Sequence, residues 1–120
     1  MERQIFINLA VKDVQKSMDF YTALGFTNNP QFSDDAGKCM VWSENIFVML
    51  LTHKKFASFA TKPIADTKSN LAALYSLAMD SLDEVNHLME RGLKVCDMTF
   101  NCYVSTFSKY GVTLLMFKVF

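Results

Sequence analysis

Three cysteines are the first residues of this 120-residue chain that could do chemistry. Cys39, Cys96 and Cys102 are odd in number, and the last two are spaced too widely for a Cys-x-x-Cys redox pair. No cluster of further Cys or His residues stands near them, as a zinc knuckle would require. We therefore expect reduced, mostly buried thiols, which is typical of a cytoplasmic protein.

The two histidines are the next candidates, as general bases. His53 stands beside the Lys54–Lys55 pair, and His87 stands in a predicted helix. Neither has a neighbour in the sequence that would complete a triad, so surface positions are favoured for both. Asp34–Asp35 is interpreted as a turn, because adjacent side chains point apart and do not form an acid–base dyad. The sequence thus predicts no catalytic residue.

The composition excludes several classes of protein. Apolar residues make up 51% of the chain and aromatic residues 13%, which is enough for a folded core and excludes disorder. Twelve basic residues cancel twelve acidic ones, so the chain lacks the positive surplus that drives nucleic-acid binding. The apolar run Ile5–Val11 is short and is followed by charged residues. We expect neither a signal sequence nor a membrane span there.

The chain consists of two similar halves, and their strands and helices must position any functional site. Residues 9–26 resemble residues 77–93: each stretch is an apolar strand, a polar cap, an amphipathic helix and a glycine. In the first copy, Asp13 predicts the N-cap and Gly25 an αL C-cap. The predicted buried stripe of this helix is Val14, Met18, Tyr21 and Leu24.

The second copy carries the same signals. Ser81 and Glu84 have the spacing of a capping box, and Gly92 is expected to end the helix. Its predicted stripe is Leu82, Val85, Leu88 and Met89. After the helices, strands are predicted near 26–33, 37–43 and 46–52, and near 93–96, 101–107 and 112–119.

This order predicts an α+β fold of two βαβββ modules, with Ile5–Val11 as the first strand. Module one spans 1–60 and module two spans 71–120. Lys54–Ala60 is expected to form a short helical turn. The polar stretch 61–70 is interpreted as the linker within a single domain.

The first half also resembles a known superfamily. Residues 6–14, followed by a helix that ends in Phe20-Tyr21-Thr22-Ala23-Leu24-Gly25-Phe26, are similar to the opening module of glyoxalase-like proteins. Asn45–Thr52 resembles the fourth strand of their uncharacterised glyoxalase-like branch. The chain thus resembles the vicinal oxygen chelate superfamily, which contains glyoxalase I, bleomycin-resistance proteins and extradiol dioxygenases. The resemblance implies a half-open mixed β-sheet cup. It weakens after residue 92, where only Gly111 of the usual Asp-Pro-Asp-Gly-His-x-x-Glu ending is kept.

The resemblance also implies which positions of this chain would hold a metal ion. Metal-dependent members carry one ligand on the first and one on the last strand of each module, usually His, Glu or Gln. The matching positions here are Asn8, Met49, Ser76 and Leu115. Zinc, nickel, manganese and iron need imidazole or carboxylate donors, which this set lacks. We therefore expect no metal and no other cofactor.

Strand alternation then predicts which side chains line the cup. Ala10, Ala78 and Thr113 are expected on the same face as the main candidates. The candidate ligand residues are Phe6, Asn8, Phe47, Met49, Leu51, Leu74, Ser76, Leu115 and Phe117. Such a lining suits an apolar or aromatic small molecule better than a charged one. Alternatively, the aromatic side chains simply fill the cup.

Three function classes remain open from the sequence. The first is a metal-independent protein that binds a small molecule, as bleomycin-resistance relatives do. The second is a metal-dependent lyase, isomerase or dioxygenase of the same superfamily, against which the missing ligands argue. The third is a dimeric scaffold with a filled cup. We favour the first, and we expect a homodimer because so short a chain does not cover both faces of its sheet well.

Overall fold

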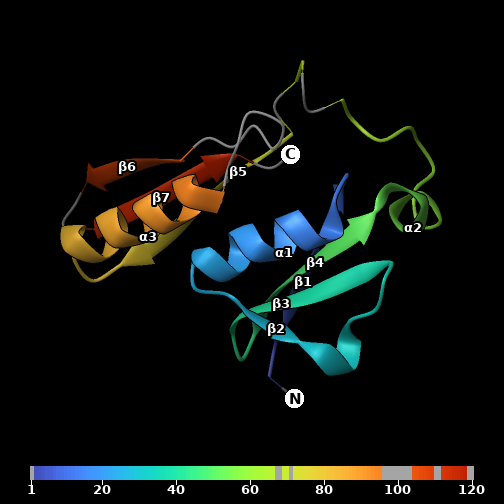
Figure 1. The fold of residues 1–120 in the computed structure, drawn as a ribbon, viewed down its shortest axis with the longest axis horizontal. Helices are drawn as coiled ribbons and strands as arrows, with labels where there is room; N and C mark the ends of the chain where they lie inside the picture. Colours follow the sequence, from blue (N-terminus) through green and yellow to red (C-terminus); the bar gives the residue numbers. More distant parts are fainter. Residues whose placement is uncertain (1, 67–68, 71, 96–103, 110–111, 119–120) are drawn as a thin grey trace. The chain divides into compact units, whose positions relative to one another are not determined.

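The computed structural model describes residues 2–66, 69–70, 72–95, 104–109 and 112–118, the last two ranges by their backbone only (Figure 1). The elements are β1 (Ile5–Val11), α1 (Val14–Ala23), β2 (Thr27–Asn29), a 3-10 turn (Pro30–Phe32), β3 (Gly37–Ser43), β4 (Ile46–Thr52), α2 (His53–Ala57), β5 (Leu74–Met79), α3 (Leu82–Val95), β6 (Val104–Lys109) and β7 (Val112–Lys118). The fold is α+β, as predicted.

The chain divides into two compact units, Met1–Ile64 and Ala65–Phe120. The division falls within the stretch 61–70 that the sequence suggests as a linker. Each unit forms its own sheet. The first sheet has the strand order β1-β4-β3-β2, with β1 parallel to β4 and the other pairs antiparallel. The described strands of the second unit form an antiparallel sheet in the order β5-β7-β6.

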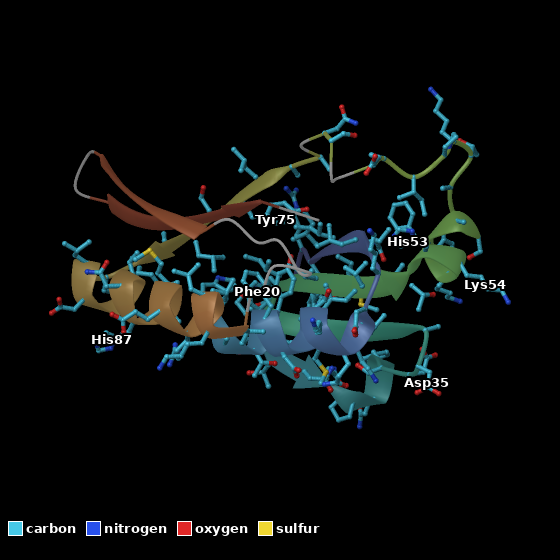
Figure 2. All side chains as sticks on the ribbon, turned by 45° about the horizontal axis from the view of Figure 1, so that its top comes forward. Phe20, Asp35, His53, Lys54, Tyr75 and His87 are labelled. Carbon is cyan, nitrogen blue, oxygen red and sulfur yellow. The ribbon has the colours of Figure 1, made fainter. Side chains whose placement is uncertain are left out.

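One face of the first sheet forms a core with α1. Alternate strand residues on this face are buried, namely Leu9, Val11, Met40, Val48 and Leu50. The helix packs against β2, β3 and β4 and brings in Phe20 (Figure 2) and Leu24, and both side chains are fully buried. Burying a side chain of this size contributes about 1.5–3 kcal/mol. The opposite face of the sheet is therefore the one on which a site can lie.

Helix α1 begins and ends as the sequence predicts. The Asp13 carboxylate accepts a hydrogen bond from the Lys16 N–H at 3.0 Å. At the other end, Gly25 has a φ of 103°. The Phe26 N–H donates to the Tyr21 carbonyl and the Gly25 N–H to the Thr22 carbonyl, both at 3.0 Å. This pair of bonds is a Schellman motif, and a residue with a Cβ at Gly25 would cost about 1–2 kcal/mol.

The buried stripe of α1 differs from the predicted one. Tyr21 and Leu24 are buried as expected, but Val14 and Met18 are only half-buried. Phe20, which the predicted stripe omits, is fully buried. The ring of Tyr21 then contacts Phe26 with the centroids 5.2 Å apart, so the aromatic cluster follows the helix end.

Strand β2 is shorter than the predicted strand 26–33. Pro30 has no N–H to donate to a sheet, and the chain leaves the sheet there in a 3-10 turn. The Asn29 side chain caps this turn by accepting from the Gln31 N–H at 3.0 Å. The Ser33 hydroxyl accepts from the Cys39 N–H at 3.0 Å, which ties the returning chain to β3.

The second unit departs from the predicted module at the end of its helix. The Ser81 hydroxyl accepts from the Glu84 N–H at 3.1 Å, as the capping-box spacing suggests. The helix does not end at Gly92, which is helical and buried, but continues to Val95. The predicted strand 93–96 is therefore wrong at its described residues. Of the predicted strand 101–107, the first three residues lie outside the described residues. No helix among the described residues is long and apolar enough to cross a membrane.

Candidate functional site

The face of the first sheet opposite α1 carries the five candidate residues of the first half. Phe6 is paired with Phe47 and Asn8 with Met49 in the parallel register of β1 and β4. The rings of Phe6 and Phe47 stack with centroids 4.5 Å apart and an interplanar angle of 7°. Phe6 is 51% exposed, so this aromatic pair presents a ring to its surroundings.

Leu51 is the third residue of this face on β4, and it is buried. It lies opposite Gly37 of β3. A Cβ on that glycine would lie 2.8 Å from the Leu51 Cδ2, so the isobutyl group occupies the space that a larger residue would need. Because Gly37 has no side chain, this end of the sheet face is closely packed. The same face is exposed to its surroundings at Phe6.

A pocket of about 490 Å³ opens beside Asn8. Its described lining consists of Asn8, Phe56, Phe59 and Ala60. The volume lies within the range of about 300–1,000 Å³ that is usual for small-molecule sites. The Asn8 amide is exposed, and its Nδ2 donates only a long bond of 3.4 Å to the Phe6 carbonyl. The pocket thus combines two aromatic side chains with one polar amide.

Helix α2 brings the two phenylalanines to this place. The Thr52 hydroxyl begins the helix by accepting from the Lys55 N–H at 3.1 Å. Helical turns continue beyond Ala57, because the Phe59 N–H donates to the Phe56 carbonyl at 3.0 Å. Phe56 and Phe59 are three residues apart and so lie on the same side of the helix. The helix contacts β1 and β4.

Sequence reasoning places a short helical turn at Lys54–Ala60 but does not include Phe56, Phe59 or Ala60 in the site. The usable signal was the spacing of the two phenylalanines within that turn. That spacing places both rings on one side of the turn but does not indicate which face of the sheet this side meets.

The charged residues of α2 differ in their contacts. His53 and Lys54 are exposed (Figure 2). The Lys55 ammonium, in contrast, lies 5.3 Å from the centroid of the Phe59 ring. The interpretation of Lys54–Lys55 as a purely solvated pair is therefore incomplete, because Lys55 makes a cation–π contact with a residue that lines the pocket.

Cys39 lies on the same face, opposite Met49. It is 1% exposed, and burial raises the pKa of its thiol. A protonated, inaccessible thiol is a poor nucleophile, so Cys39 acts here as a small apolar side chain. Cys96 and Cys102 lie outside the described residues.

The strand register in the second half differs from the predicted one. Leu74, Ser76 and Ala78 are exposed on one face of β5. The antiparallel register places Met116 opposite Ser76, whereas Leu115 lies opposite Leu77 and Phe117 opposite Tyr75.

Residues directly opposite in an antiparallel pair share a face. Leu115 and Phe117 therefore occupy the register positions of the other face, and the prediction that they share a face with Ser76 is wrong. Thr113, opposite Met79, is displaced in the same way. Most residues of β7 are apolar at both alternating positions of the strand. The alternation of polar and apolar residues therefore does not indicate which of its two faces belongs with Ser76.

The donor set does not fit a divalent metal. In the first unit, the positions that the resemblance suggests for metal ligands supply an amide from Asn8 and a thioether from Met49, which are weak ligands for zinc, nickel, manganese or iron. Within the part of the chain that the structure describes, no three His, Cys, Asp or Glu residues are grouped to hold a metal ion.

The other residues with possible chemistry have structural roles or lie on the surface. Asp34 accepts hydrogen bonds from the Ala36 N–H at 2.8 Å and the Gly37 N–H at 3.0 Å, so it forms the turn before β3, as predicted. His87 is exposed on α3 (Figure 2). It has no described hydrogen-bond partner that would orient it as a base.

Comparison with family models gives no match, and neither does comparison with curated proteins. Among solved structures, the chain is similar to the structure of hypothetical protein SA1046 from S. aureus. The identity is 24% and the TM-score is 0.71, over 98% of this chain and 85% of that chain. This similarity shows a shared fold and does not indicate a function.

Proposed function

We propose that this chain is a metal-independent binding protein for an apolar or aromatic small molecule. The observation that carries the proposal is the pocket beside Asn8, where an exposed amide meets the side chains of Phe56 and Phe59. Concave sites of this kind bind through apolar contact and use a few polar groups to orient the ligand. The stacked rings of Phe6 and Phe47 extend the apolar surface along the same sheet face.

The resemblance to the vicinal oxygen chelate superfamily, combined with the missing metal ligands, supports small-molecule binding over catalysis. Stabilising the enediolate of a glyoxalase reaction requires a metal or an equivalent electrophile, which is worth several kcal/mol. Asn8 and Met49 cannot supply it. The proposal therefore places the chain with the relatives that sequester a small molecule, and it predicts no glyoxalase turnover with added nickel or zinc.

Fluorescence titration with N-phenyl-1-naphthylamine, a neutral aromatic probe, tests the proposal. We expect saturable binding that Phe59→Ala weakens about tenfold or more, because one face of the pocket is lost. Phe32→Ala is the matched control, since Phe32 is 67% exposed and Phe59 is 71% exposed in the same unit, but Phe32 is not among the described lining residues. Equal effects of the two substitutions, or no saturable binding at all, would refute the proposal.

A further inference from the structure

We infer that the preferred ligand of this pocket is an aromatic anion, such as an aryl carboxylate, and that Lys55 supplies the opposite charge. The inference rests on the proposed function, since it names the chemical class of ligand for the same pocket. It goes beyond the sequence-based expectation, which considered only the strand positions of the cup and found no charge there.

The position of the Lys55 ammonium carries the inference. Its Nζ lies 5.3 Å from the centroid of Phe59, and Phe59 lines the pocket. The positive charge is therefore held beside the pocket wall by a ring that a bound ligand would also touch. The described contact of this ammonium is an aromatic ring and not a carboxylate, so its charge is not neutralised by that contact.

The charges within the helical segment itself favour an anion in the same way. Residues 53–62 contain Lys54, Lys55 and Lys62 and no acidic residue. The turn before β3 contains Asp34 and Asp35 and is tied to the start of α2, because the Thr52 N–H donates to the Ala36 carbonyl at 2.9 Å. The carboxylate of Asp34 accepts two backbone hydrogen bonds at its Oδ1. These bonds to the Ala36 and Gly37 N–H groups offset part of its negative charge.

A cationic ligand is disfavoured by the same geometry. Cations bind aromatic pockets over the faces of the rings, but Lys55 already occupies this position at Phe59. A second positive charge there would be repelled. An aromatic anion avoids this conflict, because its ring can pack against Phe56 and Phe59, which line the pocket, while its carboxylate faces the Lys55 ammonium beside Phe59.

Displacement of N-phenyl-1-naphthylamine by 2-naphthoate and by the neutral 2-naphthamide tests the inference. The two competitors share one ring system and differ in the charge of one group. We expect wild-type protein to bind 2-naphthoate about two- to fivefold more tightly than 2-naphthamide at low salt, with the preference lost at high salt. Lys55→Gln should abolish the preference by weakening 2-naphthoate binding more than 2-naphthamide binding, and Lys55→Arg should keep it.

Lys54→Gln is the control, because it removes an equal charge from the neighbouring position on the same helix. Equal affinities for the two competitors in the wild type, or an equal loss of preference in Lys54→Gln and Lys55→Gln, would overturn the role of Lys55 while leaving the proposed function intact. Absence of binding by N-phenyl-1-naphthylamine and both competitors would refute the proposed function and this inference together.

Discussion

Burial of Cys39 determines both the reactivity of its thiol and its effect on how the stability of the folded state depends on pH. The thiol pKa is raised above its ordinary value of 9.0 by burial. In the unfolded chain the thiol ionises near 9.0, whereas in the folded protein it keeps its proton to higher pH. This difference stabilises the folded state fully below pH 9.0, and the stabilisation is lost as pH rises from 9.0 through the raised pKa.

We therefore expect the free energy of unfolding to fall between about pH 8 and about pH 10, and to fall less in Cys39→Ala. Urea unfolding at the two pH values measures the difference. The pKa of Tyr75 is also raised by burial, which acts in the same direction at higher pH, so the comparison with Cys39→Ala is needed to assign the effect. An identical pH dependence in both proteins would contradict the assignment to Cys39.

The side chains at Asn8 and Met49 give a second prediction at this scale. An amide and a thioether are poor donors for borderline divalent cations. Protein purified without chelator should contain well below one equivalent of zinc, nickel, manganese or iron by elemental analysis. One equivalent that disappears in Asn8→Leu would show that the site holds a metal after all, and would restore the enzyme hypothesis.

Some residues of the candidate site could be predicted from the sequence, and others could not. Asn8 and Met49 could be identified because a strand fixes the direction of its side chains. Phe56, Phe59 and Lys55 could not, because their role depends on where a short helix turns back over the sheet. No local pattern specifies that packing.

At the scale of elements, the contact between β3 and β4 at Gly37 is sensitive to added volume. A Cβ there would lie 2.8 Å from the Leu51 Cδ2 and 3.4 Å from the Leu50 carbonyl oxygen. We expect Gly37→Ala to destabilise the protein by about 1–3 kcal/mol, as measured by urea unfolding.

The cost should be smaller in a Leu51→Ala background, since the crowded methyl group is then absent. A Leu50→Ala background serves as the control, because the Leu50 side chain is buried on the other face and only its carbonyl approaches Gly37. Additive effects in both backgrounds would show that Leu51 is not the residue that crowds the substitution.

The two ends of α1 are predictable for a reason that does not apply to the register of β7. Asp13 and Gly25 act through hydrogen bonds to backbone groups a few residues away, so the sequence contains the whole interaction. The register of β7 depends on its partner strand, and a shift of one residue moves every side chain to the opposite face. Gly92 was misleading because a glycine can lie inside a helix when that position is buried.

At the scale of the whole molecule, exposed apolar residues on the first unit predict self-association. Ile5 and Ile46 are large, exposed and paired on one face of the sheet where β1 and β4 begin, and the exposed Phe6 lies beside them on the other face. Apolar groups of this kind mark interaction surfaces. Sedimentation equilibrium at micromolar concentration should give a mass near twice 13.7 kDa. Phe6→Lys should lower it toward the monomer, and a wild-type mass of one chain would contradict the prediction.

Trp42 gives the molecule a built-in reporter for one of its two units. It is the single tryptophan of the chain, and its ring lies 4.9 Å from that of Phe26 in the first unit. Its emission therefore follows the aromatic cluster at the end of α1, whereas far-ultraviolet circular dichroism follows the helices of both units. A denaturation curve recorded with both signals distinguishes cooperative unfolding of the whole chain from separate unfolding of its halves without any labelling.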